Sequence, residues 1–364
     1  MKWAIKNHIR RQDVQEIYNH LVDRESLFGN TILLTGANGF LPSLLLDVLL
    51  QINNNLPLSD AINIFCLVRC ANKFKTNLSA RYGAEGIVDS VNVVECDLTN
   101  GLQNASDLMA LPSIDFIIHA ASHASPKYFG KNPVETALPN LVGTIDLLKL
   151  AQSKSTKKFL FFSTSEVYGV MPSDSIPTRE DQFGALDPTN VRSCYAESKR
   201  MGETLCAAWY KQFNVPSVIV RPFHTYGPGM LLDDGRVFAD FVADILENRD
   251  IVIRGDGLAK RAYCYVGDAV LGFLITLLSG TPGEAYNIGN PFEEVSVREL
   301  AELLVGMYPA KKLKVVRQTQ PASSGYMPSA VARNCPDITK AKQLGWSPRM
   351  SITDGFRRTI DSYQ

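Results

Sequence analysis

Two residues that could carry acid–base chemistry lie four positions apart, Tyr195 and Lys199. A helix places residues i and i+4 on one face, so the lysine ammonium would lie near the tyrosine phenol and favour its ionised form at neutral pH. A phenolate can take the proton of an alcohol while hydride leaves the same carbon. The spacing alone is a weak signal, because a chain with 13 tyrosines shows Tyr-x-x-x-Lys about once by chance and a solvated helix pair explains it too. The surrounding elements decide its meaning.

The first hydrophobic run predicts a strand over 31–35 that leads through a glycine turn into an apolar helix over 41–50. In this turn, Gly36 allows the chain to reverse tightly and Gly39 lets the backbone approach a pyrophosphate, which the unpaired N–H groups of the helix would bind. A plain strand-to-helix turn is the alternative. Pro42 stands where such a loop usually has a third glycine; it is tolerated in a first helical turn, but it removes one N–H and adds bulk.

Strand-like runs recur with helical stretches between them, at 62–68, 91–95, 116–119, 159–163 and 217–220. This alternation is typical of an α/β fold with a doubly wound, Rossmann-type parallel sheet, whose ligands bind beyond the carboxyl ends of the strands. We expect a dinucleotide-binding domain over 29–222 that also takes in part of 262–290. A smaller C-terminal lobe, drawn mainly from 223–364, would bind the substrate.

Residues 1–28 form an N-terminal extension ahead of the first predicted strand. Its apolar residues follow a helical spacing, at Ile5, Ile9, Val14, Ile17 and Leu21. They predict one or two amphipathic helices that pack on the surface of the fold or against a partner subunit. No apolar stretch of signal-peptide length is present in this segment.

The composition argues against several classes of function. The chain has 364 residues, of which 45% are hydrophobic, enough to fill a sizeable core, and its formal net charge is zero. Without a basic field we expect no nucleic-acid partner and no membrane contact, and no run reaches the ~18 apolar residues of a membrane span. Seven cysteines without Cys-x-x-Cys indicate reduced thiols in a cytoplasmic protein. Five histidines without ligand spacing predict no metal site.

The ends of the predicted strands suggest where a dinucleotide would lie. Arg69 ends the second strand where an acid usually binds the ribose hydroxyls, and a guanidinium there, helped by Lys73, suits the 2′-phosphate of NADP. An exposed basic turn is the alternative. His119, at the end of the fourth strand, could equally be a core histidine. The predicted cofactor-binding residues are Gly36, Asn38, Gly39, Phe40, Leu41, Arg69, Asp97, Leu98, Ala120, Ala121, Ser122, Tyr195 and Lys199.

The fifth strand ends in Ser163-Thr-Ser-Glu-Val-Tyr-Gly169, which brings two hydroxyls and a carboxylate near the start of the Tyr195 helix. Thr164 could hydrogen-bond the reacting hydroxyl, Ser165 could orient a substrate, and Glu166 could transfer a proton. Capping and turn formation account for such a segment equally well.

Together these motifs resemble the extended short-chain dehydrogenase/reductases of the NAD-dependent nucleotide-sugar epimerase, dehydratase and decarboxylase family, over about 29–362. The stretches that carry the resemblance are Thr35-Gly-Ala-Asn-Gly39, His119-Ala-Ala-Ser122, Ser163 to Gly169, Tyr195 with Lys199, Arg221-Pro-Phe-His-Thr-Tyr-Gly-Pro228, Arg261-Ala-Tyr-Cys-Tyr-Val-Gly-Asp268 and Asn287-Ile-Gly-Asn-Pro291. The resemblance implies an NAD-dependent homodimer that oxidises a nucleotide sugar. Arg69 leaves NAD and NADP both open.

Within this family, Ser165-Glu166, Arg192 and the match of Ala121-Ser-His-Ala-Ser-Pro126 and Asp234-Gly-Arg-Val237 favour the UDP-glucuronate decarboxylase branch. A 4,6-dehydratase, a 4-epimerase and a catalytically silent cofactor-binding regulator are the alternatives. The resemblance implies that the catalytic residues are Thr164, Ser165, Glu166, Tyr195, Lys199 and Arg261. It implies that the substrate contacts are Ser125, Arg192, His224, Arg236, Val237 and Arg261.

Two departures from the family pattern, and one residue with two implied roles, bear on these expectations. His224 stands where the family usually has an asparagine that touches the substrate. Arg261 has two implied roles, because in dehydratases and epimerases the matching arginine holds the nucleotide phosphates. Pro139 is expected to interrupt a helix that forms a four-helix dimer interface in relatives.

Overall fold

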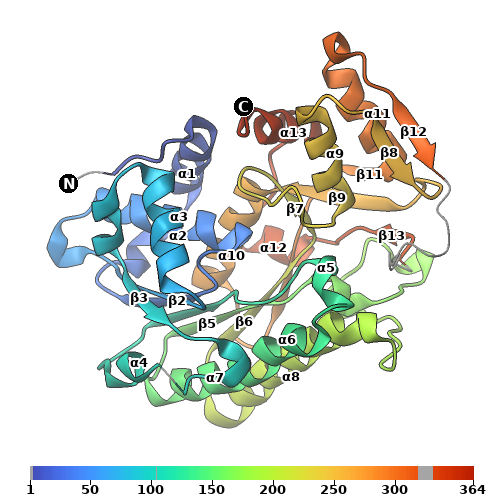
Figure 1. Ribbon diagram of the computed structural model, residues 1–364. Coiled ribbons are helices and arrows are strands. Elements are labelled where there is room, and N and C mark those ends of the chain that lie inside the picture. The colour runs from blue at the N-terminus through green and yellow to red at the C-terminus, as the bar shows by residue number, and fades with distance from the viewer. Residues whose placement is uncertain (1–2, 104, 319–330) are drawn as a thin grey trace.

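A seven-stranded parallel sheet organises the larger part of the molecule (Figure 1). The computed structural model describes residues 3–103, 105–318 and 331–364. The strand order is β10-β6-β5-β4-β1-β2-β3, with every pairing parallel. The strands are β1 (Thr31–Thr35), β2 (Asn63–Val68), β3 (Asn92–Glu95), β4 (Phe116–His119), β5 (Lys158–Phe162), β6 (Ser217–Pro222) and β10 (Ala285–Ile288). The predicted Rossmann-type sheet is therefore confirmed, and β10 adds a strand from late in the chain.

Helices cover both faces of this sheet, which explains why its strands are hydrophobic throughout rather than alternating. In β1, Ile32 and Leu34 belong to the core cluster on one face, whereas Leu33 belongs to the cluster on the other. Helices α2 (Phe40–Asn54) and α10 (Val266–Ser279) supply the first cluster, and α7 (Thr144–Ser153) and α8 (Cys194–Phe213) supply the second. Two packed faces hold the carboxyl ends of the strands in fixed positions. The other helices of this domain are α3 (Ala71–Tyr82), α4 (Ser106–Ala110), α5 (Pro126–Phe129) and α6 (Pro133–Leu138).

Pro139 does not interrupt its helix, contrary to the expectation from the sequence. Helix α6 continues through a π-helical turn, Pro139–Gly143, into α7. The wider turn keeps the backbone right-handed while the proline ring replaces one N–H donor. Asn140, in this turn, donates from Nδ2 to Thr136 O at 3.1 Å and to Ser198 Oγ of α8 at 3.0 Å. The turn thus ties the segment to the helix that carries Tyr195.

A smaller lobe sits above the carboxyl ends of the sheet. In its main sheet, β9 (Lys260–Tyr265) pairs with β7 (His224–Tyr226), β11 (Glu294–Ser296) and β13 (Arg333–Asn334). A second pair joins β8 (Ile251–Arg254) to β12 (Val315–Gln318), and the lobe's helices are α9 (Val237–Leu246), α11 (Val297–Met307) and α13 (Ile352–Asp361). Helix α12 (Thr339–Gln343) instead packs beside β10 of the large sheet. Because β7 follows β6 closely and β9 leads into α10, the chain crosses between the two parts at the sheet's edge.

The N-terminal extension packs on its own chain. Helix α1 (His8–His20) lies against α2 and α10, and Figure 1 shows it near the C-terminal helix α13. The predicted apolar face is confirmed, because all five of its members are buried: Ile5, Ile9, Val14, Ile17 and Leu21. Two polar contacts also join α1 to the C-terminal segment, from Asn7 Nδ2 to Ser362 O at 2.8 Å and from Arg358 Nη1 to Asp13 Oδ1 at 2.9 Å.

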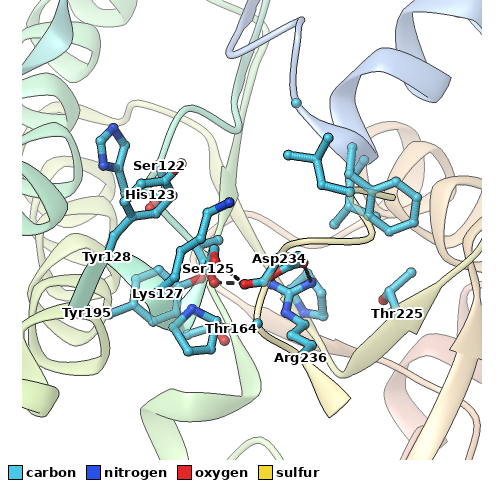
Figure 2. A pocket seen from close by; sticks show the side chains of 18 of the residues that line it. Ser122, His123, Ser125, Lys127, Tyr128, Thr164, Tyr195, Thr225, Asp234 and Arg236 are labelled. Carbon is cyan, nitrogen blue, oxygen red and sulfur yellow. Dashed lines mark hydrogen bonds and ion pairs between the residues drawn. The ribbon is translucent and has the colours of Figure 1, made fainter. Parts of the chain in front are cut away.

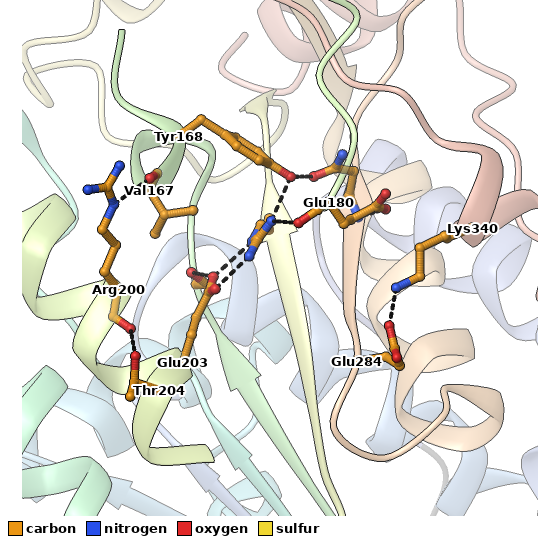
Figure 3. A network of polar contacts seen from close by, with 11 residues as sticks. Val167, Tyr168, Glu180, Arg200, Glu203, Thr204, Glu284 and Lys340 are labelled. Carbon is orange, nitrogen blue, oxygen red and sulfur yellow. Dashed lines mark hydrogen bonds and ion pairs between the residues drawn. The ribbon is translucent and has the colours of Figure 1, made fainter. Parts of the chain in front are cut away.

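A buried ion pair fastens the sheet to α8. Arg221 of β6 binds both carboxylate oxygens of Glu203, with Nε at 2.9 Å and Nη2 at 2.7 Å. Its Nη1 donates to Tyr168 Oη at 2.8 Å and to Glu180 O at 2.9 Å. Figure 3 shows this network with Tyr168, Glu180 and Glu203 converging on one point. One guanidinium therefore connects a strand, a helix and the loop that follows Tyr168.

Seven cysteines are present and all are free thiols, with Cys70 exposed. Over the described ranges, 3–103, 105–318 and 331–364, no helix is both long and apolar enough to cross a membrane.

Candidate active site

A cleft of about 1710 Å³ opens where the carboxyl ends of the sheet strands face the smaller lobe. Every residue that the sequence analysis assigned to cofactor, substrate or catalysis lines this cleft. The structure thus brings together segments more than 200 positions apart, from Gly36 to Arg261. Their assignment to particular roles stays a prediction.

The glycine turn has the geometry of a phosphate-binding loop. Gly36 has φ +71°, and a Cβ there would stand 2.8 Å from Ala121 Cα, so only glycine fits. Gly39 is the N-cap of α2, and its own N–H donates to Gly36 O at 2.8 Å. Pro42 is the third residue of α2, where the N–H would have no helical acceptor, so the proline breaks no helical hydrogen bond. A dinucleotide fits this turn.

Tyr195 lies in the first turn of α8, buried and stacked on Phe129 with ring centroids 5.0 Å apart. Burial raises the pKa of Tyr195 to about 12, while the Thr164 hydrogen bond and the Arg236 charge lower it. Lys199 Nζ is 6.0 Å from the centre of the Tyr195 ring and donates to Phe162 O at 2.6 Å. Burial lowers the pKa of Lys199 to about 7. Desolvation of the phenol thus opposes the ionisation of Tyr195 that Lys199 was expected to favour, and ionisation of Tyr195 at neutral pH stays a prediction.

Thr164→Val is expected to move the pH at which kcat/KM is half-maximal to the alkaline side. The Thr164 hydroxyl is a hydrogen-bond partner that lowers the pKa of Tyr195, so its loss raises that pKa by roughly one pH unit. The pH dependence of kcat/KM measures this change. Thr164→Ser keeps the hydroxyl and serves as the control; an unmoved profile for Thr164→Val would show that Thr164 does not tune the phenol.

Glu166 and Arg192 form an ion pair on the same wall of the cleft. The distance from Arg192 Nη1 to Glu166 Oε2 is 3.3 Å, and both side chains are partly buried. Glu166 lies in a 3₁₀ turn, Ser165–Tyr168, whose N-cap is Thr164; the Thr164 hydroxyl oxygen accepts the Glu166 N–H at 3.2 Å. Thr164 therefore caps the turn, and the same segment still presents Glu166 to the cleft. A carboxylate paired with an arginine beside a tyrosine can exchange protons and bind an anionic group.

Two predicted substrate residues bring polar groups to the smaller lobe's side of the cleft. His224 is largely buried and aligned opposite Tyr263 in the β7–β9 pair. Burial lowers the pKa of His224 well below its usual value, and the Arg261 and Arg236 charges lower it further, so its imidazole is neutral. The Arg261 guanidinium donates to Val331 O and to Lys260 O, each at 2.8 Å. Backbone carbonyls therefore hold this arginine in place at the cleft.

The other predicted substrate residues take part in a contact between the two lobes, shown in Figure 2. Ser125 Oγ donates to Asp234 O, and Arg236 Nη2 donates to Ala124 O at 3.1 Å. Arg236 also pairs with Asp234, while Val237 begins α9. These contacts close one end of the cleft beside Thr164 and Tyr195. The sequence did not single out Asp234 as their partner, because nothing local in it identifies which residue faces Ser125.

The predicted ribose and strand-end residues have defined partners. Arg69 Nη1 lies 2.6 Å from His123 Nε2, and Asp97 Oδ1 accepts the Thr99 N–H at 3.0 Å. His119 is a core histidine, since its ring nitrogens meet Thr35 Oγ1 at 3.0 Å and Thr144 Oγ1 at 3.1 Å. Burial lowers the pKa of His119 to about 3. Among the residues that the structure describes, no three His, Cys, Asp or Glu side chains are placed to hold a metal ion.

Several residues that line the cleft were given no role by the sequence analysis, among them Arg10, Tyr263 and Asn334. Tyr263 could have been found, because it shares a strand face with Arg261 two positions earlier. Asn334, which donates from Nδ2 to Ser165 Oγ at 3.3 Å, has no motif around it. Arg10 lies outside the apolar spacing of its helix, so the pattern gave no signal that its side chain would be buried.

Comparison with known proteins shows which family this chain resembles and which of its members are similar in sequence. A model of the NAD dependent epimerase/dehydratase family matches residues 32–289. UDP-glucuronic acid decarboxylase 5 of Arabidopsis thaliana is 36% identical over 329 residues, covering 89% of this chain and 86% of that protein. UDP-glucuronic acid decarboxylase 1 of Xenopus tropicalis is 33% identical over 336 residues, covering 92% of this chain and 72% of that protein.

Solved structures share the whole architecture. UDP-glucuronic acid 4-epimerase from Bacillus cereus, in complex with NAD, has a TM-score of 0.72 and 26% identity, covering 91% of this chain and 96% of its own. UDP-glucose 4-epimerase from Thermotoga maritima, with UDP-glucose, has a TM-score of 0.76 and 23% identity, covering 92% of this chain and 98% of its own. The second likeness is one of fold.

Proposed function

The chain belongs to the NAD-dependent epimerase/dehydratase family, and from that premise we propose that it is a UDP-glucuronate decarboxylase. It would oxidise the sugar at C4 and release the C6 carboxylate as carbon dioxide. The observation that carries the proposal is the Glu166–Arg192 ion pair in the cleft beside Thr164 and Tyr195, because a cation and a proton-exchanging group are what the reaction of a sugar carboxylate needs. The identity to named UDP-glucuronic acid decarboxylases supports it.

We propose NAD rather than NADP as the cofactor. The family is NAD-dependent, and a structural relative binds NAD. The sequence analysis predicted that the Arg69 guanidinium would bind a 2′-phosphate. In the structure this guanidinium contacts His123, in the loop that follows β4. Gly36, Gly39 and the start of α2 would hold the pyrophosphate. When bound, NAD supplies the hydride acceptor for the sugar carbon.

Side chains of the cleft carry out the other steps of the proposed reaction. Tyr195 takes the C4 hydroxyl proton and Thr164 orients that hydroxyl, leaving a C4 ketone. The carboxylate is then β to a carbonyl, so the C5–C6 bond breaks, carbon dioxide leaves and the electron pair moves to the C4 oxygen. Arg261 and Arg192 stabilise the enolate charge, and Glu166 delivers the proton that C5 needs. Arg261 keeps a second proposed role on the nucleotide phosphates.

The proposal is tested by incubating the purified full chain with UDP-glucuronate and either NAD or NADP, then measuring product mass. We expect loss of carbon dioxide with NAD, and no conversion of UDP-glucose, which has no carboxylate to lose. Loss of water from UDP-glucose, whose C6 carries a hydroxyl, would instead indicate a 4,6-dehydratase. An unchanged mass with inversion at C4 would indicate a 4-epimerase, the activity named in the Bacillus cereus relative. Either result overturns the decarboxylase assignment.

Arg192→Gln is expected to raise the KM for UDP-glucuronate about tenfold, because one charge-assisted contact to a carboxylate is worth roughly 1.5 kcal/mol. Steady-state kinetics at saturating NAD measure the change. Arg179→Gln removes an arginine from a surface pair with Asp181 and serves as the matched control. Equal KM values for the two variants would contradict a carboxylate-binding role for Arg192.

We further propose that the protein is a homodimer that associates through α7 and α8. Helix α8 exposes Met201 and Phe213, which are 46% and 42% exposed, and buried apolar surface is what a stable subunit contact needs. The unbroken course of α6, the π turn and α7 keeps this face continuous. Sedimentation analysis tests the assembly, and a cytoplasmic location stays a prediction.

A further inference from the structure

An arginine of the N-terminal extension reaches the cofactor end of the cleft. Arg10, in the first turn of α1, is 6% exposed and lines the cleft together with the glycine turn and the start of α2. Its backbone N–H is capped by Asn7 Oδ1 at 3.0 Å, which fixes the helix start from which the side chain projects. A buried arginine at a cleft wall has a definite orientation, because its guanidinium must find partners for five donors.

Arg10 shares a buried carboxylate with a second arginine. Asp47 of α2 is fully buried and accepts from Arg10 Nε at 2.6 Å through Oδ2. Its other oxygen accepts from Arg81 Nη1 of α3 at 2.7 Å. Two guanidiniums and one carboxylate sum to a net charge of +1. Because Arg81 also lines the cleft, this charge lies beside the end of α2 that already favours anions.

The same guanidinium is linked to the first turn of α2, which directly follows the glycine turn. Arg10 Nη2 donates to Ser43 Oγ at 3.0 Å, and Ser43 Oγ donates to Phe40 O at 2.9 Å. Phe40 and Leu41 are the first two residues of α2, whose N–H groups lack helical acceptors. Pro42 offers no N–H at the third position. Only the N–H groups of Phe40 and Leu41 therefore remain as donors in this turn. The hydrogen bonds from Arg10 to Ser43 and from Ser43 to Phe40 O hold the backbone that carries them.

Arg10 also faces the smaller lobe. A Cβ built at Gly229 would stand 2.7 Å from Arg10 Nη1, so the turn after β7 approaches the guanidinium closely. Next to it, the Tyr363 hydroxyl donates to Met230 O. The N-terminal extension, helix α2 and the smaller lobe thus meet at one side chain.

From these contacts we propose that Arg10 is a cofactor-positioning residue, through which the N-terminal extension holds the first turn of α2 and adds positive charge at the pyrophosphate end of the cleft. The proposal rests on dinucleotide binding by this family and is independent of which sugar is the substrate. It makes Arg10, and through it helix α1, part of the cofactor site. Arg10 acts through Ser43 and Asp47, and it takes no part in the chemical steps.

The test is the affinity of the full chain for NADH, titrated with nicotinamide fluorescence as the signal. Arg10→Met is expected to raise Kd about tenfold, equivalent to ~1.4 kcal/mol, while Asp47 keeps Arg81 as a partner and the fold persists. Arg10→Lys keeps the charge but cannot reach both Asp47 and Ser43, so a Kd between those of the two proteins is expected. Arg11→Met alters the neighbouring, exposed arginine of α1 and should leave Kd unchanged.

A lower melting temperature with an unchanged Kd for Arg10→Met would show that Arg10 only stabilises the fold, and would overturn the proposal. If Arg10→Met yields no folded protein, Arg10→Lys decides: a Kd raised at least threefold supports the proposal and a wild-type Kd overturns it. Because no sugar is present in the titration, failure of UDP-glucuronate decarboxylation would leave this result standing.

Discussion

Tyr195→Phe is expected to lower kcat about 10³-fold, the range over which a positioned acid–base group accelerates proton transfer. Phenylalanine removes only the hydroxyl and keeps the stacking on Phe129, so the cleft retains its shape. We therefore expect the Kd for NADH and the melting temperature to stay close to wild type. Single-turnover kinetics with UDP-glucuronate would separate loss of the chemical step from loss of binding.

Tyr210→Phe is the matched control, because Tyr210 lies on the same helix and is 36% exposed, away from the cleft. It should retain full turnover. If Tyr195→Phe also kept its turnover, Tyr195 would not be the base. If it lost turnover but kept the biological activity, a role as a catalytically silent regulator would replace the enzyme proposal.

Arg221→Met is expected to lower the free energy of unfolding by about 3–5 kcal/mol, the cost of leaving a buried carboxylate without its partner. Glu203 would retain only its bond from Ser163, and the carbonyl of Glu180 would lose a donor. Chemical denaturation measures the loss. The network in Figure 3 predicts that the cost comes from the stranded charge rather than from lost packing.

Two further variants separate these causes. The double variant Arg221→Met with Glu203→Met removes both charges and should recover part of the stability. Arg357→Met breaks an exposed pair with Asp354 and should change stability by less than about 1 kcal/mol. If the double variant were no more stable than Arg221→Met alone, the stranded charge would not be the cause.

The sheet was predictable because its strands are buried on both faces. The segments Thr31–Thr35 and Phe116–His119 are short, mostly apolar runs between helices, and such runs are typical of the inner strands of a parallel sheet. β10 was not resolved as a strand from the sequence, because Asn287 interrupts its apolar run. In the fold that asparagine is buried and bonded to Tyr168 and to the carbonyls of Thr178 and Asp337, contacts that local sequence does not encode.

The candidate site was predictable residue by residue but not in its electrostatics. Motifs located many of the residues that line the cleft, because most motifs lie at the end of a strand and the others lie at the start of a helix. The burial that opposes ionisation of Tyr195 was not predictable, because the i, i+4 rule gives proximity to Lys199 and says nothing of how deeply both groups are buried. Arg10 was missed for a related reason: its partners, Ser43 and Asp47, are identified only once α1 is packed on α2.

The packed N-terminal helix has a practical consequence for anyone who reshapes this enzyme. The family match begins at residue 32, which makes that position the obvious boundary for a truncation. A truncation there would uncover the apolar surface of α2 and α10 that α1 covers, and leave Asp47 with Arg81 as its only arginine. Shortened versions, domain fusions and chimaeras with relatives should therefore carry residues 3–28 along with the sheet they cover.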